Sequence, residues 1–175
     1  MVTTTIPLTE AEALEFLRAH QPMPADADLD DELIDTYDSA RRLFRDHPND
    51  ECIPLFLNSF GDGDGLGVYQ LVDEVIRAHD PSAVVRALAD SLTSPHPSVR
   101  SWSAELAAEV PDPSLSAPLQ NLLSDPNPDT RTFAVYALAE IGGTENVAAI
   151  EALAATEREP AVIEAIELAH DSLTN

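Results

Sequence analysis

A turn that occurs twice constrains the fold of this chain more than any other feature of its sequence. Residues 95–100 read PHPSVR and residues 126–131 read PNPDTR, so the motif returns after 31 residues. The period extends beyond the turn, because Trp102 corresponds to Phe133. A fixed period of about 20–50 residues is typical of stacked repeats. The sequence therefore predicts a helical solenoid, a fold that offers partners an extended surface.

Helical periodicity continues through the rest of the chain. Apolar spacing predicts four helical segments before residue 81 and three antiparallel helix pairs after it, and no segment alternates as a strand does. The predicted helices cover residues 9–20, 30–46, 49–60, 68–76, 84–92, 99–110, 115–123, 130–141, 147–155 and 161–173. We predict an all-α fold in which an α-solenoid over residues 81–175 continues a helical N-terminal portion, residues 1–80, as one domain. The third pair has Val162 or Ile163 in place of the repeated arginine, which is typical of a terminal repeat that closes a stack.

The repeated turn also carries a resemblance to a known family. The pattern Asp-Pro-x-Pro-x-x-Arg at residues 125–131, followed by an alanine-rich helix, resembles HEAT repeats, especially those of the short bilin-lyase-like bacterial subclass. The resemblance covers residues 81–173. It implies an α-solenoid that binds proteins, and it does not by itself imply lyase activity.

A second resemblance lies upstream of the repeats. Residues 55–71, LFLNSFGDGDGLGVYQL, are similar to a segment of small bacterial HEAT-repeat proteins that are encoded beside polymorphic toxins. Those proteins are regarded as immunity proteins. The resemblance implies a bacterial protein that neutralises a cognate toxin.

The charge of the chain bears on its partners and its compartment. Thirty-two Asp and Glu face nine basic residues, all of them Arg, which gives a net charge of −23. Such a surface repels phosphate backbones and attracts basic proteins, so we expect a protein partner and no nucleic acid. The alternative is that the acidity only maintains solubility or reflects a salt-adapted host. Because the sequence shows neither a signal peptide nor an apolar run long enough to span a membrane, we expect a cytoplasmic protein that does not bind membranes.

Acidic side chains are dense at several places in the N-terminal half of the chain. They form three clusters, around residues 26–35, 46–51 and 62–74. We predict that the first and third clusters bind a cationic partner, and the alternative is a solvated surface. The predicted partner-binding residues are Asp31, Asp35, Asp62, Asp64, Asp73 and Glu74.

One stretch of the third cluster has a partial calcium-loop pattern. Asp62, Asp64, Gly67 and Asp73 occupy positions 1, 3, 6 and 12 of such a loop. Leu66 at position 5 offers no side-chain oxygen, and position 12 is Asp rather than the longer Glu. We therefore favour a glycine-rich turn and expect neither tight calcium binding nor any other metal or cofactor.

The sequence lacks a recognisable catalytic constellation, so we expect no enzymatic activity. The histidines have no metal-ligand spacing, and Cys52 is expected to be a small buried side chain. Arg100 and Arg131 are predicted to be structural, each binding an acidic group or a carbonyl of the neighbouring repeat. Trp102 is predicted to lie in the core, with an interface anchor as the alternative.

These features together favour a binding protein over an enzyme. The leading hypothesis is a cytoplasmic immunity protein that neutralises a bacterial toxin domain, for which a basic nuclease is the candidate. The first alternative is a general scaffold or adaptor. The second is an enzyme similar to bilin lyases or to HEAT-type DNA glycosylases, and the absence of a basic face or pocket opposes it.

Overall fold

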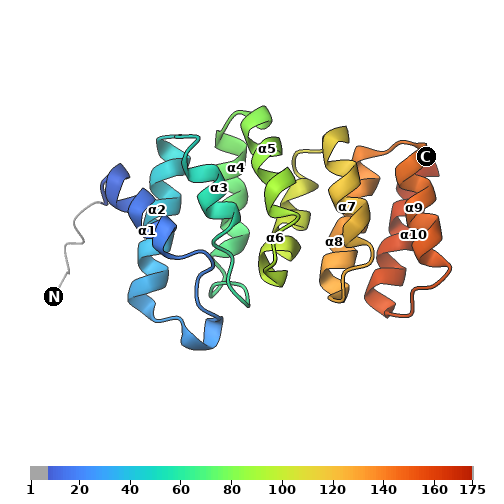
Figure 1. The fold of residues 1–175 in the computed structure, drawn as a ribbon, viewed down its shortest axis with the longest axis horizontal. Coiled ribbons are helices and arrows are strands. Elements are labelled where there is room, and N and C mark those ends of the chain that lie inside the picture. The colour runs from blue at the N-terminus through green and yellow to red at the C-terminus, as the bar shows by residue number, and fades with distance from the viewer. Residues whose placement is uncertain (1–7, 175) are drawn as a thin grey trace. The chain divides into compact units, whose positions relative to one another are not determined.

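The structure is a computed structural model that describes residues 8–174, and within this range it contains helices and turns but no strand (Figure 1). The chain divides into two compact units, residues 1–84 and residues 85–175. Helix α5 (Pro81–Ser91) crosses from the first unit into the second.

Over its described residues, 8–84, the first unit contains four complete α-helices and two short 3₁₀ turns, followed by the start of α5. Its elements are α1 (Glu10–Ala19), η1 (Asp26–Asp28), α2 (Asp31–Asp46), α3 (Cys52–Leu57), η2 (Tyr69–Val72) and α4 (Asp73–Ala78). Helix α2 packs against α1 and α4, and α1 also packs against α3. Helix α1 begins at a capping box in which Thr9 accepts a hydrogen bond from Glu12 N, while the Glu12 carboxylate accepts one from Thr9 N.

An aromatic cluster forms the core of the first unit. Tyr37 lies at its centre, with its ring edge-on to Phe56 and Tyr69 at centroid distances of 5.6 and 5.5 Å. All three rings are fully buried. The Tyr37 hydroxyl hydrogen-bonds to Ser59 Oγ at 2.9 Å, and burial raises its pKa well above the ordinary value. The cluster therefore holds α2, α3 and η2 together through apolar contact and one satisfied buried hydroxyl pair.

The predicted helix over residues 68–76 is shorter and less regular in the structure. Bonds from Val68 N to Gly65 O and from Leu71 N to Val68 O are of the i to i+3 type, so this part forms the 3₁₀ turn η2. Only the six residues of α4 continue as α-helix. The periodicity was correct for Val72, Val75 and Ile76, which are buried, but wrong for Leu71, which is 36% exposed because the 3₁₀ turn changes the direction of its side chain.

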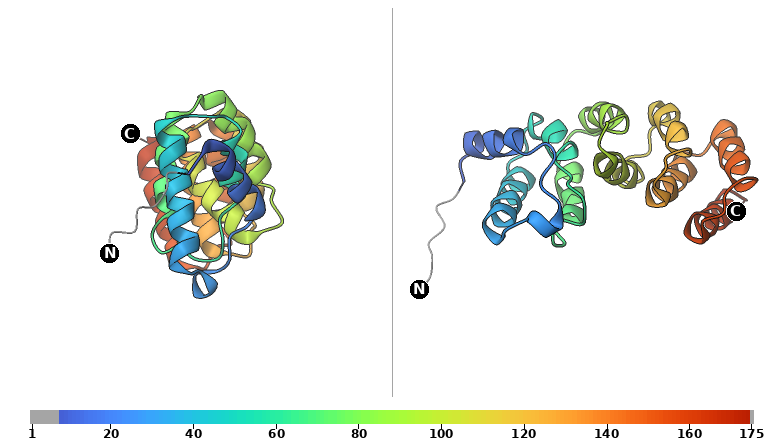
Figure 2. Two further views of the ribbon diagram at one scale, coloured as in Figure 1. Left: turned by 90° about the vertical axis from the view of Figure 1, so that its left-hand side faces the viewer. Right: turned by 60° about the horizontal axis from the view of Figure 1, so that its bottom comes forward.

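The second unit consists of stacked helices in two rows. Its elements are α6 (Pro97–Ala107), η3 (Pro113–Leu115), α7 (Ser116–Leu122), α8 (Pro128–Ile141), α9 (Thr144–Ala154) and α10 (Pro160–Thr174), which follow the end of α5. Helix α8 packs against both α6 and α10, which form one row with it, while α7 and α9 lie in the other row (Figure 2, right). The predicted all-α solenoid of helix pairs is confirmed.

Proline sets the register of the row formed by α6, α8 and α10. Each of these helices begins at a proline, which suits the first helical position because that backbone N–H has no partner within the helix. Three residues after the proline stand Arg100, Arg131 and Ile163. Ile163 therefore occupies the arginine position of the third repeat, and Val162 fills the preceding buried position.

Candidate partner-binding surface

Arg100 connects its own turn with the turn of the next repeat. Its Nε donates to Asp125 Oδ2 at 2.8 Å, and its NH1 donates to the carbonyl oxygen of Ser94 at 2.9 Å. Asp125 is buried, and its other carboxylate oxygen accepts a bond from Asn127 N. The ion pair thus fixes the start of α8 relative to α6.

Arg131 repeats this arrangement one repeat later. Its Nε and NH2 donate to the two carboxylate oxygens of Glu157 at 2.8 and 3.1 Å, and its NH1 donates to the carbonyl oxygen of Asp125 at 2.8 Å. The Arg131 and Glu157 side chains are only 13% and 6% exposed. Hydrogen bonding from Arg131 lowers the pKa of Glu157 from 4.5 to about 2. Arg100 and Arg131 therefore make equivalent ion pairs, each with an acidic residue of the next turn. We call these two ion pairs the ladder.

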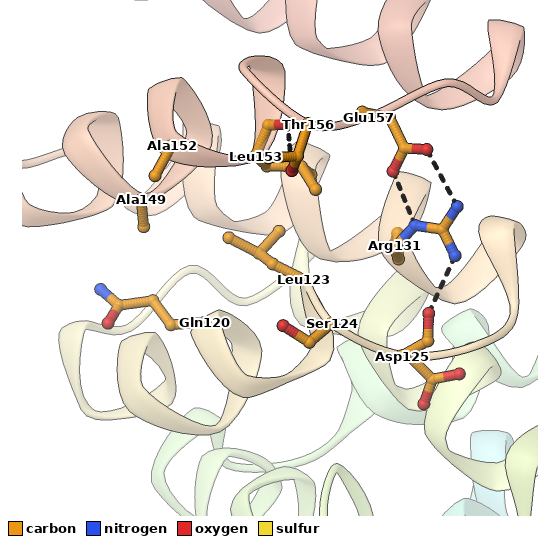
Figure 3. A pocket seen from close by; sticks show the side chains of 10 residues that line it. All are labelled: Gln120, Leu123, Ser124, Asp125, Arg131, Ala149, Ala152, Leu153, Thr156 and Glu157. Carbon is orange, nitrogen blue, oxygen red and sulfur yellow. Dashed lines mark hydrogen bonds and ion pairs between the residues drawn. The ribbon is translucent and has the colours of Figure 1, made fainter.

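A groove of about 540 Å³ lies beside this second ion pair (Figure 3). It is lined by Gln120, Leu123, Ser124, Asp125, Arg131, Ala149, Ala152, Leu153, Thr156 and Glu157. Figure 3 shows the Arg131 guanidinium directed at Glu157 and at the carbonyl of Asp125. All three of its nitrogens already donate within the chain, so the groove does not present a cation that an anionic ligand could bind without breaking the ladder.

Trp102 does not lie in the core, in contrast to the sequence prediction. It is half-buried on α6, and its equivalent on α8, Phe133, is half-buried as well. Tyr136 follows Phe133 by three residues and therefore lies on the same face of α8. The position equivalent to Tyr136 on α10 is Leu168, whose exposed fraction is 53%. The prediction of a core residue was wrong because the buried stripe of α6 passes beside Trp102, through Val99, Ser103 and Leu106.

These four side chains form one strip across three neighbouring helices. We call Trp102, Phe133, Tyr136 and Leu168 the aromatic strip. Helices α6, α8 and α10 pack in sequence, and the four residues occupy equivalent or adjacent positions on them. Leu168 is exposed, and the three rings are half-buried. Partly accessible apolar side chains of this size are common in protein-binding surfaces.

Carboxylates flank the aromatic strip. On α8, Asp129 precedes Phe133 by four residues and Glu140 follows it by seven, so both lie on the same face, and both are exposed. Glu105 follows Trp102 by three residues on α6. Glu109 is exposed in the turn that extends α6, where its N–H donates to Leu106 O at 3.1 Å. The second unit thus presents aromatic rings and negative charge together.

The predicted acidic residues of the first unit fall into two groups. Asp31, Asp35, Asp62 and Asp64 are exposed. Asp73 instead pairs with Arg77 at 2.9 Å. The Glu74 carboxylate binds Arg41 at 2.6 Å and Arg45 at 3.2 Å, and these bonds lower its pKa. For Asp73 and Glu74, the structure therefore gives an ion-pairing role within the chain, which the sequence prediction did not include.

Asp26 brings the first and third acidic clusters together. Its backbone N–H donates to the carbonyl oxygen of Asp62 at 2.9 Å. Its carboxylate accepts bonds from Asp64 N at 3.0 Å and from Gly65 N at 2.9 Å. The glycine-rich loop is therefore organised around a carboxylate of its own chain. Leu66, at the tip of this loop, has a positive φ of 53° and is 54% exposed.

The geometry of the loop bears on the calcium-loop alternative. Asp64 Oδ1 accepts a hydrogen bond from Gly67 N at 3.0 Å, and Asp73 is paired with Arg77. Among residues 8–174, no group of three or more His, Cys, Asp or Glu has an arrangement suited to a metal ion. The absence of tight calcium binding that we expect from the sequence stays a prediction.

Sequence reasoning missed one buried contact of the single cysteine. Cys52 Sγ lies 3.5 Å from His79 Nε2, which also accepts a bond from Asn49 N at 3.0 Å. His79 Nδ1 contacts the carbonyl oxygen of Val75 at 2.7 Å and must donate to it. Burial raises the pKa of Cys52 to about 12, so the thiol is protonated and is not an activated nucleophile. The two residues are 27 positions apart, and no local pattern joins them.

Comparison with known proteins agrees with the geometry of the second unit. Residues 85–169 match a protein-family profile described as HEAT repeats. No curated protein matches the chain. Within the described residues, no helix combines the length and apolar character that crossing a membrane requires. The matched residues span the repeated turns, both arginine ion pairs and the aromatic strip, so this part of the chain is similar to HEAT repeats.

Proposed function

We propose that this chain is a non-enzymatic binding protein whose partner is a basic protein domain. The observation that carries the proposal is the aromatic strip with its flanking carboxylates. HEAT repeats commonly present such helix rows to other proteins, and aromatic side chains dominate the binding energy of many interfaces. The net charge of −23 favours a cationic partner over a neutral one.

The exposed acids of the first unit would add to the rate of association. Asp31, Asp35, Asp62 and Asp64 extend negative potential into solvent. A field of this sign accelerates the encounter with a positively charged domain, and salt screens it beyond about 8–10 Å. The strip would then supply the short-range contacts, while the acids would steer the approach.

The finer proposal is that the partner is a bacterial toxin domain and that binding neutralises it in the cytoplasm. It is supported by the resemblance of residues 55–71 to immunity proteins and by the basic character that a nuclease needs in order to hold phosphate. A general adaptor for basic proteins is the second candidate, because HEAT repeats serve both roles.

Binding of the purified chain to a purified basic protein domain, such as a toxin domain from a neighbouring gene, tests the broader proposal. We expect association to slow as salt rises from low to physiological strength. We also expect Glu109→Gln with Glu140→Gln to weaken binding, whereas Glu145→Gln with Glu151→Gln on α9 should change it little. Both pairs remove the same charge from exposed positions, so the comparison isolates the strip. Equal effects of the two pairs would contradict a specific role for this surface.

Co-expression in a sensitive bacterium tests the finer proposal. Cells that produce the toxin domain should survive when they also produce the folded chain, and they should die when they produce a strip variant that no longer binds. If the cells died although the chain was abundant, folded and bound to the toxin domain, neutralisation would be rejected. The adaptor function would then remain as the proposal.

A further inference from the structure

Leu66, at the tip of the glycine-rich loop, has a backbone conformation that is unfavourable for leucine. Its φ is 53°, and within residues 8–174 no other residue except glycine has a positive φ. In this left-handed region the Cβ atom crowds the following carbonyl oxygen, so glycine is favoured and asparagine is tolerated. Residues in such conformations persist where the surrounding structure imposes them, and they are frequent at functional sites.

Hydrogen bonds on both sides of Leu66 impose this conformation. Gly67 N donates to Asp64 O at 3.2 Å and to Asp64 Oδ1 at 3.0 Å. On the other side, the Asp26 carboxylate accepts a bond from Gly65 N at 2.9 Å. The loop is therefore held in one shape before any partner arrives, and a preorganised loop loses little conformational entropy on binding.

The Leu66 side chain gains little from packing within its own chain. It is 54% exposed, and Leu71, five residues later, is 36% exposed. Gly65 and Gly67 on either side have φ values of 59° and 85°, so a glycine at position 66 would suit the loop without strain and without exposing apolar surface. The exposed part of the leucine stabilises the protein only when a partner covers it.

Carboxylates lie in the same loop as this exposed leucine. Asp62 and Asp64 are both exposed, at four and two residues before Leu66. We infer that Leu66 inserts into an apolar pocket of the basic partner domain, and that lysine or arginine side chains at the rim of that pocket face Asp62 and Asp64. This inference rests on the proposed function and adds to it an anchoring contact in the first unit.

The charge of the loop disfavours two other occupants. In a contact between two copies of the chain through this loop, Asp62 and Asp64 would face the same carboxylates, and like charges across an interface oppose association. An anionic membrane surface would repel a chain with a net charge of −23. Charge complementarity thus selects a basic protein as the partner that covers Leu66.

Two substitutions at position 66 test the inference, with the purified basic domain of the proposed function as the probe. Leu66→Asn removes the apolar side chain but suits a positive φ, so thermal unfolding should show a stability equal to or above that of the wild type. The same variant should bind the basic domain roughly tenfold more weakly, because the buried apolar surface is lost. Leu66→Met is the matched control, since it keeps the apolar volume at the same backbone position, and it should retain the wild-type affinity.

Each contrary result has its own meaning. If Leu66→Asn bound the domain as tightly as the wild type, the inference would be overturned and the proposed function would stand. A marked loss of stability in Leu66→Asn would overturn it too, by showing that the leucine serves the fold. Self-association, or binding to phosphatidylcholine vesicles, that Leu66→Asn abolishes would assign the leucine to another occupant. Failure of the wild type to bind any basic domain would reject the proposed function and this inference with it.

Discussion

Arg131 and Glu157 form a bidentate ion pair across 26 residues of sequence, with Nε to Oε2 at 2.8 Å and NH2 to Oε1 at 3.1 Å. Arg131 stands at the start of α8, and Glu157 stands in the turn before α10. Because Arg131 also binds the carbonyl of Asp125, a single guanidinium joins the turns of two successive repeats.

Replacing Arg131 with Ala should lower the free energy of unfolding by about 2 kcal/mol, because Glu157 would remain buried without its cation. Two backbone donors, Arg158 N and Glu159 N, still bind the carboxylate and limit the loss. Arg131→Lys should recover part of the stability, since lysine keeps the positive charge but cannot form the bidentate hydrogen bonds to Glu157. Urea unfolding measures both variants. Full stability of Arg131→Ala together with lost partner binding would show that the residue serves the partner.

The Glu157 carboxylate should make stability depend on acid pH. Its pKa is depressed from 4.5 to about 2 in the folded chain, so its stabilising effect is complete above pH 4.5. The effect should decline as the pH falls below 4.5 and vanish near 2. Unfolding curves of the wild type and of Glu157→Gln at several pH values should therefore converge over this window. Curves that stay parallel would contradict the depressed pKa.

Two glycines with similar positive φ values should respond differently to alanine. Gly65 has a φ of +59°, and an added Cβ would lie 2.6 Å from the Tyr69 ring. Gly142 has a φ of +68°, and nothing lies within 4 Å of an added Cβ. Gly142→Ala should cost about 1–3 kcal/mol from the backbone alone, because a φ of 68° with a ψ of −161° is essentially a glycine conformation. Gly65→Ala should cost about 1–3 kcal/mol in addition to its own backbone strain, because the buried ring must move. Thermal unfolding of the two variants compares them directly.

The glycine-rich loop should not bind calcium tightly. Leu66 contributes no side-chain oxygen, Asp64 already caps Gly67 N, and Asp73 is paired with Arg77. Calorimetric titration of the chain with calcium should show no sub-micromolar affinity. A strong signal that Asp62→Asn abolishes would reverse this assignment.

Reversing the exposed charges of the first unit should slow association without unfolding the chain. Changing Asp31, Asp35, Asp62 and Asp64 to Lys weakens the steering field, while the contacts of the strip are retained. Stopped-flow mixing with the basic domain should show a lower on-rate, and the difference from the wild type should shrink at high salt. An unchanged on-rate at low salt would exclude these residues from steering.

Local sequence predicted the helices and the ladder because both depend on short-range patterns. A proline followed three residues later by arginine identified α6 and α8, and apolar spacing identified which faces are buried. The sequence also indicated that each arginine reaches the next repeat, although it did not name Asp125 and Glu157 as the partners.

The binding surface was harder to predict from the sequence. Which side chains remain accessible depends on how neighbouring helices pack against one another. Trp102 was expected in the core because it lies on the apolar stripe of its helix, and the packing of α8 on α6 leaves it half-buried. Glu74 belongs to an acidic run in sequence but meets Arg41 across 33 residues. Such pairings become visible only when tertiary contacts are known.

The ladder has a consequence for how such a chain can change its length. Each arginine takes one partner from the residue before its own turn, Ser94 for Arg100 and Asp125 for Arg131, and its other partner from the following turn. If residues 95–125 were duplicated in tandem, every arginine would meet both kinds of partner again, with Asp125 of the first copy serving the second. A gene duplication of this one segment would therefore add a whole repeat, together with another ring and another carboxylate on the same row, without altering any residue.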